Sequence, residues 1–310
     1  LAKSCELPFS RTGEMGEAAR DLLSKADKKL KGGLLSFLSG SSRYDEACEL
    51  YQQAANQFKL QKMWQDAAEA FIRCAHCQHQ LQSATEEANF LMEAASVMRK
   101  YSTSDAVEQY NKAVELYSAA GRFAQSAKIL KQVAELYEGD GDYERAVQFY
   151  RRAADLFEMD DYGKSQLTAC MLKIAEYIAR YEKKLEEAIQ IFEKEGQKAL
   201  QNSLIQFGAK EHFLKAGILH LATNDAVNAK LAYEKYEAMD PRFGPSREGQ
   251  LLKAMVEAFE QNNVDQFVEA IHEYDTITKL DAWKTHFLYN VKEQMAPSAP
   301  EGEGGEVDLT

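Results

Sequence analysis

The spacing of proline constrains the fold of this chain more than any other feature of the sequence. Pro8 is followed by no other proline until Pro241, and Pro297 and Pro300 lie near the C-terminus. Because proline breaks helices, the long stretch between Pro8 and Pro241 lacks the strongest helix breaker. The same stretch is rich in Ala, Glu, Lys, Gln and Leu, which favour helix, and it shows no strand-like alternation. The sequence therefore predicts an all-α protein.

A recurring phrase indicates how these helices pack. An alanine is followed about one turn later by an aromatic residue, as in "YDEACELY", "SDAVEQY", "YERAVQFY" and "LEEAIQIF". Small residues permit close approach of two helices, and the aromatic rings fill the space between them. The alanines are Ala47, Ala106, Ala146 and Ala188, and the aromatic residues are Tyr51, Tyr110, Tyr150 and Phe192. The alanine–aromatic pairs of adjacent helices lie about 20 residues apart, so a unit of two helices takes about 40 residues. This is longer than the 34 residues of a tetratricopeptide repeat (TPR). We predict a TPR-like α-solenoid, a right-handed twisted array of antiparallel helical hairpins, closed by a C-terminal helical bundle.

Changes in composition predict four segments along the chain. Residues 1–14 begin without methionine, and we interpret them as a leader without function, because the helical pattern opens at Met15. Residues 15–200 form the hairpin array, and residues 201–295 form the C-terminal bundle. Residues 296–310 have no apolar periodicity and are expected to be a flexible acidic tail.

A hydrophobic loop at 32–40 interrupts the first hairpins. Its apolar side chains lie between glycines and serines, and a lysine-rich helix end precedes them. Two interpretations are open: the loop folds back onto the first hairpins, or it dips into an anionic membrane surface. We favour the membrane, with contacts from Leu34, Leu35, Phe37 and Leu38.

Charge and cysteine content narrow the classes of partner and compartment. The formal net charge is −12, which makes nucleic acid an improbable partner. No apolar run reaches the roughly 20 residues that span a bilayer. The five cysteines are sparse and odd in number, which favours reduced thiols in the cytoplasm over a disulfide framework.

The best metal candidate in the sequence is "CAHCQH". Cys74 and Cys77, with His76 and His79, suggest zinc, but a second ligand pair at zinc-site spacing is missing. We therefore predict small thiols on a packed helix face and no metal or other cofactor. The sequence also lacks GxxxxGK[ST], GxSxG and HExxH motifs, so we predict no catalytic residues and no enzyme.

Basic residues recur near predicted turns, although the chain as a whole is acidic. Cations at helix C-termini complement the helix dipole, which explains any one of them. Their recurrence at hairpin intervals is better explained by one curved face suited to an acidic, elongated partner. They are Lys59, Lys62, Arg99, Lys100, Arg122, Lys128, Lys164 and Lys173.

Several long segments from Met15 to Thr310 carry a family resemblance. They are "LLSFLSGSSRYDEACELYQQAANQFK", "AELYEGDGDYERAVQFY", "AKEHFLKAGILHLATNDAVNAKLAYEKYE", "DPRFGPSRE" and "YDTITKLDAW". Together with an acidic-Leu ending, they resemble soluble NSF attachment proteins (SNAPs) of the alpha/beta type. The resemblance implies an adaptor whose hairpin array lies along the SNARE four-helix bundle. It also implies that the C-terminal bundle engages the AAA ATPase NSF and stimulates ATP hydrolysis.

The resemblance also implies residue roles by position. SNARE contacts fall on Lys59, Lys100, Arg122, Lys128, Lys210 and Arg247. NSF contacts fall on Asp225, Glu257, Glu260, Asp308 and Leu309. The family often has lysine where Ala169 stands, so Lys164 or Lys173 is expected to substitute, and Lys173 joins the predicted SNARE set.

Two further expectations complete the interpretation. The protein is expected in the cytoplasm and peripherally on the cytosolic faces of membranes, serving vesicle trafficking. The alternative is a helical-repeat co-chaperone or scaffold that binds peptide termini in a concave groove. The 34-residue repeat that would favour this alternative is absent.

Overall fold

The computed structural model describes residues 10–31, 42–160 and 162–295. These residues form fourteen α-helices and one short 3-10 helix, and no strand occurs among them. The predicted all-α fold is therefore confirmed. The helices are α1 (Ser10–Lys31), α2 (Ser42–Leu60), α3 (Trp64–Gln80), α4 (Ala84–Met98), α5 (Thr103–Ala119), α6 (Phe123–Gly139), α7 (Tyr143–Glu158), α8 (Lys164–Tyr181), α9 (Leu185–Leu200), η2 (Gln206–Gly208), α10 (Ala209–Ala222), α11 (Ala226–Met239), α12 (Arg247–Glu260), α13 (Val264–Ile277) and α14 (Ala282–Met295).

The chain divides into two compact units within α8. The first unit is Leu1–Cys170 and the second is Met171–Thr310. The sequence predicts that the hairpin array ends at residue 200, because the alanine–aromatic pattern continues into α9, and this boundary stays a prediction. In the structure α9 packs on α10, where Gly196 leaves no room for a Cβ against the ring of Phe213.

The first helix begins earlier than the sequence pattern indicated. Helix α1 starts at Ser10, two residues after Pro8, whereas the apolar periodicity opens at Met15. Proline is excluded from helix interiors, and α1 lies wholly after Pro8. No helix of the described residues is long and apolar enough to span a membrane.

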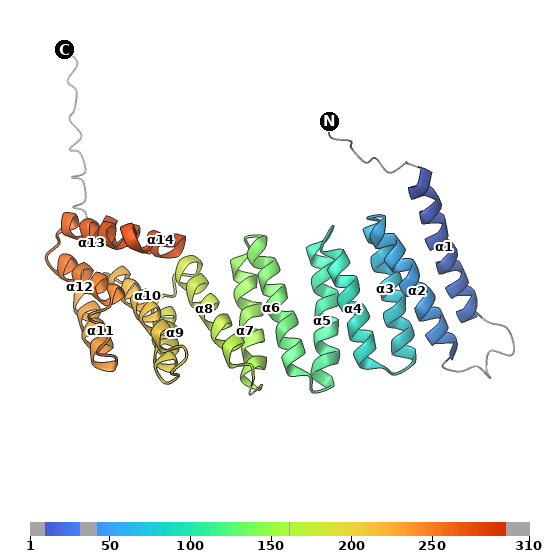
Figure 1. The fold of residues 1–310 in the computed structure, drawn as a ribbon, viewed down its shortest axis with the longest axis horizontal. Helices are drawn as coiled ribbons and strands as arrows, with labels where there is room; N and C mark the ends of the chain where they lie inside the picture. The colour runs from blue at the N-terminus through green and yellow to red at the C-terminus, as the bar shows by residue number, and fades with distance from the viewer. Residues whose placement is uncertain (1–9, 32–41, 161, 296–310) are drawn as a thin grey trace, which may run out of the picture. The chain divides into compact units, whose positions relative to one another are not determined.

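Short turns connect the helices from α2 to α7 in chain order (Figure 1). In the α5–α6 turn, the amide of Arg122 donates to the carbonyl of Tyr117 at 2.8 Å, and Gly121 donates to Ser118 at 3.0 Å. This pair of bonds satisfies the last carbonyls of a helix and requires a left-handed residue, here Gly121 with φ of 71°. Left-handed residues occur at Lys62, Gln82, Gly121, Gly141, Lys183, Asn224 and Asn262. Such short turns force neighbouring helices to run antiparallel.

Side-chain bonds between alternate helices define two layers in the first unit. Helices α1, α3, α5 and α7 form the odd layer, and α2, α4, α6 and the start of α8 form the even layer. Each pair of bonded residues comes from alternate helices. In the odd layer these are Arg73–Asp27 and Arg152–Asn111, and in the even layer Lys59–Glu93 and Lys131–Gln166. A helical-hairpin array has this two-layer arrangement.

The core of the array follows the predicted alanine–aromatic pattern. Ala47, Ala106, Ala146 and Ala188 are fully buried. The aromatic residues one turn later, Tyr51, Tyr110, Tyr150 and Phe192, are also buried. Each of these three tyrosines keeps a polar partner for its hydroxyl; the hydroxyl of Tyr150, for example, donates to Glu138 Oε2 at 2.7 Å. The prediction that small and aromatic residues interlock between helices is confirmed.

The cysteines of the zinc candidate lie in this core. Cys74 and Cys77 are fully buried beside Cys48, and the Cys74 thiol donates to the carbonyl of Cys48 at 3.5 Å. Burial raises the pKa of Cys77 to about 12, so this thiol stays protonated. His76 and His79 are exposed instead. No group of three or more potential metal ligands occurs among the described residues.

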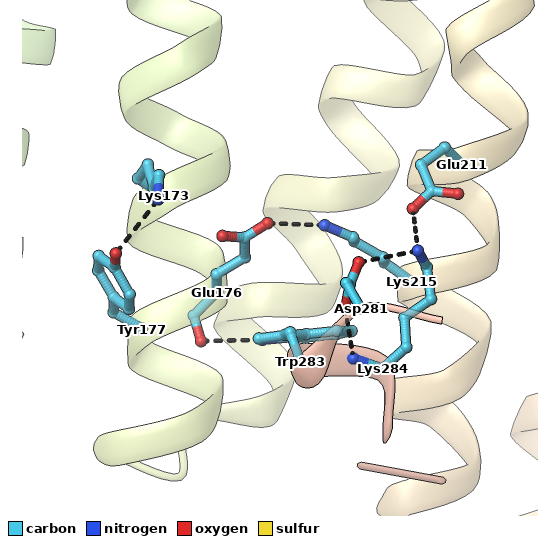
Figure 2. Close-up of polar contacts among 8 residues, drawn as sticks. All are labelled: Lys173, Glu176, Tyr177, Glu211, Lys215, Asp281, Trp283 and Lys284. Carbon is cyan, nitrogen blue, oxygen red and sulfur yellow. Dashed lines mark hydrogen bonds and ion pairs between the residues drawn. The ribbon is translucent and has the colours of Figure 1, made fainter. Parts of the chain in front are cut away.

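The second unit is held together by a polar network and by close helix approaches. Figure 2 shows Lys215 Nζ bonded to Glu176 Oε1 at 2.6 Å, which joins α10 to α8. Lys284 Nζ of α14 lies 2.6 Å from Glu211 and 2.9 Å from Asp281, and the lysine is almost fully buried. Burying a cation is costly unless it is paired. Asp281 directly precedes α14, so the contact with Glu211 of α10 is the one that holds α14 against another helix.

Candidate protein-interaction surfaces

A groove of about 500 Å³ runs across the even layer of the first unit. It is lined from α2, α4 and α6, with one contribution from α5. Its wall combines apolar and polar side chains, which suits a protein segment. The lining residues are Gln52, Glu86, Asn89, Phe90, Met92, Glu93, Tyr117, Gln125, Lys128 and Ile129.

Three of the predicted SNARE-contacting cations lie at this groove. Lys128 lines it directly, and Lys59 pairs with the lining residue Glu93 at 3.1 Å. Burial raises the pKa of the lining residue Tyr117, and the nearby Arg122 opposes that rise. Arg122 is therefore close enough to the groove wall to act on it electrostatically.

The predicted cations differ in how far they are already neutralised. Lys100, Arg122 and Lys128 are exposed, and none of them forms an ion pair with another described residue. Lys59 by contrast is partly neutralised by Glu93 and also lies 5.3 Å from the ring of Phe71. Lys100 follows α4 at one end of the layer and Arg122 precedes α6 at the other, so the free charge is spread across the layer.

The predicted cations of the second unit have structural partners. Lys173 donates to the hydroxyl of Tyr177 at 3.3 Å, one helical turn away (Figure 2). Lys210 pairs with the nearly buried Glu248 at 2.9 Å, which brings it beside Arg247. Arg247 donates to the carbonyl of Tyr274 at 3.0 Å and to the hydroxyl of Thr278, and its guanidinium lies over the Tyr274 ring. Hydrogen-bond donors of Arg247 are thus already used within the fold.

The predicted acidic residues of the second unit gather at one end of the α11–α12 pair. Asp225 is the N-cap of α11, where its Oδ1 accepts from the amide of Asn228 at 2.9 Å. Glu260 in the last turn of α12 accepts from Lys230 of α11 at 3.1 Å. Glu257, one turn earlier, is close enough to Tyr233 of α11 to contribute to the raised pKa of that phenol, which burial mainly causes. Two exposed carboxylates and one capping carboxylate therefore share an acidic end.

Sequence reasoning missed two apolar residues at this acidic end. Val227 and Leu231 lie one turn apart on α11, and 67% and 55% of their surfaces are exposed. Their spacing matches the pattern of an ordinary helix, and only the structure shows that the stripe faces outward. Apolar side chains beside carboxylates form a mixed surface that suits a basic partner with apolar contacts.

Six predicted contact residues lie outside the described residues. They are the four loop residues Leu34, Leu35, Phe37 and Leu38 and the two tail residues Asp308 and Leu309.

Comparison with known proteins gives one family. The family model "Soluble NSF attachment protein, SNAP" matches residues 17–296. The alpha-soluble NSF attachment protein of Mus musculus is 37% identical over 97% of this chain and 100% of its own length. The beta-soluble NSF attachment protein of Bos taurus is 38% identical over 96% of this chain and 99% of its own. The vesicular-fusion protein SEC17 of Komagataella phaffii is 33% identical over 90% of this chain and 96% of its own.

Proposed function

Because the chain belongs to the soluble NSF attachment protein family, we propose that it is an adaptor that binds SNARE complexes and brings the AAA ATPase NSF to them. It stimulates ATP hydrolysis by NSF and couples that hydrolysis to SNARE disassembly in vesicle trafficking. As a member of this family it is an adaptor and not an enzyme.

The observation that supports SNARE binding most strongly is the free cationic charge on the even layer. Arg122 and Lys128 are exposed and unpaired among the described residues, and both lie at the groove. A SNARE bundle resembles an acidic rod, so unpaired cations beside an apolar groove provide both attraction and contact area. Cations that are not already neutralised contribute more to such attraction than cations held in ion pairs.

A charge-reversal experiment tests this assignment. Arg122→Glu with Lys128→Glu should abolish capture of an assembled SNARE complex in a pull-down. The matched control is Arg145→Glu with Arg152→Glu, which changes net charge equally but on the odd layer. Equal loss in both double variants would mean that overall charge, and not the even-layer groove, determines capture. Intact capture by the first variant would refute the assignment.

The acidic end of the second unit is proposed to contact NSF. Asp225, Glu257 and Glu260 supply negative charge, while Val227 and Leu231 supply exposed apolar surface. Together they complement a partner surface that is basic with apolar contacts. We extend this contact to Asp308 and Leu309 on the ground of the sequence alone.

The hydrophobic loop is proposed to attach the adaptor to the membrane that carries the SNAREs. Leu34 and Phe37 follow a helix end that carries Lys28, Lys29 and Lys31, a combination that suits an anionic bilayer. Leu34→Ser with Phe37→Ser should slow disassembly of membrane-anchored SNAREs and leave disassembly of soluble SNAREs unchanged. If this variant and the unaltered chain support equal rates of SNARE disassembly on liposomes, the membrane role is excluded.

A further inference from the structure

Four planar side chains form a stack at the α6–α7 hairpin of the first unit. The guanidinium of Arg145 lies 5.5 Å from the Tyr137 ring centroid, and that of Arg152 lies 5.1 Å from the Phe149 ring centroid. Between them, the Tyr137 and Phe149 rings are stacked, with centroids 5.5 Å apart and planes 24° apart. We call these four residues the arginine–aromatic stack.

Three helices hold the stack in place. Arg145, Phe149 and Arg152 share one stripe of α7, because they are four and then three residues apart. Tyr137 reaches the stack from α6, and Arg152 donates to Asn111 Oδ1 of α5 at 3.3 Å. An element fixed by three helices is more rigid than a single surface side chain. Little conformational entropy would then be lost when it binds a partner.

The two guanidinium groups remain available to an anion. Arg152 is exposed and makes no ion pair with any carboxylate of the described residues; its partners are an amide and an aromatic face. Arg145 pairs with Asp142 at 3.3 Å, but both side chains are exposed, so the pair is weak. Stacking occupies the flat face of a guanidinium and leaves its N–H edge for hydrogen bonds. Asn111 takes only Nη1 of Arg152 and Asp142 only Nε of Arg145, so the remaining N–H groups can donate to a carboxylate.

The spacing of the stack defines the partner that fits it. Arg145 and Arg152 leave the backbone of α7 two helical turns apart, so their Cα atoms lie about 10 Å apart along the helix axis. Two carboxylates seven positions apart on a partner helix have the same separation and face the same way. An apolar residue between them would pack on Tyr137 and Phe149, which are both partly buried.

We infer that the arginine–aromatic stack is a binding site for an acidic amphipathic helix of a partner protein, with carboxylates at i and i+7 and an apolar residue at i+3 or i+4. Helix-on-surface recognition of this kind relies on anchors with helical spacing. Both arginines lie on α7 of the odd layer, whereas the proposed SNARE groove is lined mainly from even-layer helices, and no residue of the stack lines that groove.

Fluorescence anisotropy with a labelled helical peptide tests the inference. The peptide carries Glu at i and i+7 and Leu at i+3, and two comparison peptides carry Gln at both Glu positions or the second Glu at i+5. The full chain should bind the first peptide and bind both comparison peptides about tenfold more weakly.

Variants of the chain then locate the site. Arg145→Gln with Arg152→Gln should weaken binding of the first peptide about tenfold, and Arg152→Lys should weaken it less. The charge-matched control Arg122→Gln with Lys128→Gln should bind the peptide normally. The stack variants should still capture a SNARE complex, so the proposed SNARE function and this site can fail separately.

Three outcomes would overturn the inference. Equal weakening by both double variants would mean a general effect of charge. Equal affinity for the i+7 and i+5 peptides would mean that the two-turn spacing is irrelevant. Binding of phosphatidylserine vesicles by the same arginines, without peptide binding, would identify a lipid surface instead of a helix. Thermal melts of each variant confirm that the fold is retained.

Discussion

The indole Nε1 of Trp283 donates a hydrogen bond of 3.0 Å to the main-chain carbonyl of Glu176, a residue 107 positions earlier in the chain (Figure 2). The Trp283 ring also packs edge-on against Phe192, and Lys215 Nζ lies 5.4 Å from its centroid. Through these contacts the first turn of α14 is fixed to α8, α9 and α10.

Replacing Trp283 by Phe should destabilise the second unit. Phenylalanine keeps an aromatic ring at the site but removes the donor to Glu176 and leaves part of the pocket unfilled. We expect a loss of about 1 to 3 kcal/mol in the free energy of unfolding, measured by urea denaturation. Trp64→Phe is the matched control at the chain's other tryptophan, which is only partly buried. Similar losses for both variants would contradict a special role for the Trp283 bond.

Glu193 should make the second unit sensitive to acid. Burial alone would raise the pKa of this carboxyl, but the contacts with His220, Lys235 and Tyr236 outweigh burial and lower the pKa to about 2. The Lys235 and Tyr236 contacts measure 2.6 Å and 2.7 Å. Because the folded pKa lies below the unfolded value of 4.5, the stabilisation is complete above pH 4.5 and is lost as pH falls toward 2.

The Glu193→Gln variant measures this contribution. At pH 7 we expect it to be less stable than the unaltered chain by about 2 to 3 kcal/mol, and the difference should shrink when unfolding is measured at pH 3. Glu186→Gln, an exposed change on the same helix, should alter stability little at either pH. A Glu193→Gln difference that does not change with pH would exclude the proposed charge interactions.

Gly217 should tolerate no larger residue, because α10 and α12 approach closely there. A Cβ at Gly217 would lie 2.4 Å from Leu252 Cδ2, well inside van der Waals contact. We expect Gly217→Ala to destabilise the chain by about 1 to 3 kcal/mol in thermal or urea unfolding. Gly139→Ala, where no atom lies within 4 Å of the new Cβ, is the control and should be nearly neutral. If both variants unfold alike, the close approach is not limiting.

Removing charge from the acidic end should separate the two proposed partners. Asp225→Asn keeps a side chain that caps helices as well as aspartate does, so α11 should form normally. Combined with Glu257→Gln and Glu260→Gln, it should reduce stimulation of NSF ATPase activity several-fold and leave SNARE capture unchanged. Loss of SNARE capture, or full ATPase stimulation, would contradict the assignment of this end to NSF.

The sequence predicted the packing of the array better than its surfaces. Ala47 and Tyr51 share a short local pattern, and short patterns are readable because helix packing repeats them. The groove could not be predicted in this way, since it arises only when Gln52, Asn89 and Ile129 come together from separate helices. The hydrogen bonds from Arg247 to the end of α13 could not be predicted from the sequence either, because they depend on how α12 and α13 pack.

The packing of α9 shows a second limit of sequence patterns. Helix α9 carries the same alanine–aromatic phrase as the array, yet Gly196 packs it against Phe213 of the second unit. The phrase reports that a helix packs closely on a neighbour and does not report which neighbour. Similarly, Tyr137 and Arg145 gave no signal as a pair, because they stack only across the α6–α7 turn.

The measurement that tests the central claim most directly is disassembly of a fluorescently labelled SNARE complex by NSF with ATP and Mg²⁺, with and without this protein. We predict rapid disassembly only when the protein is present, and loss of that activity with Arg122→Glu and Lys128→Glu. Arg145→Glu with Arg152→Glu should remain active. An equal rate of disassembly with and without the unaltered protein would contradict the account.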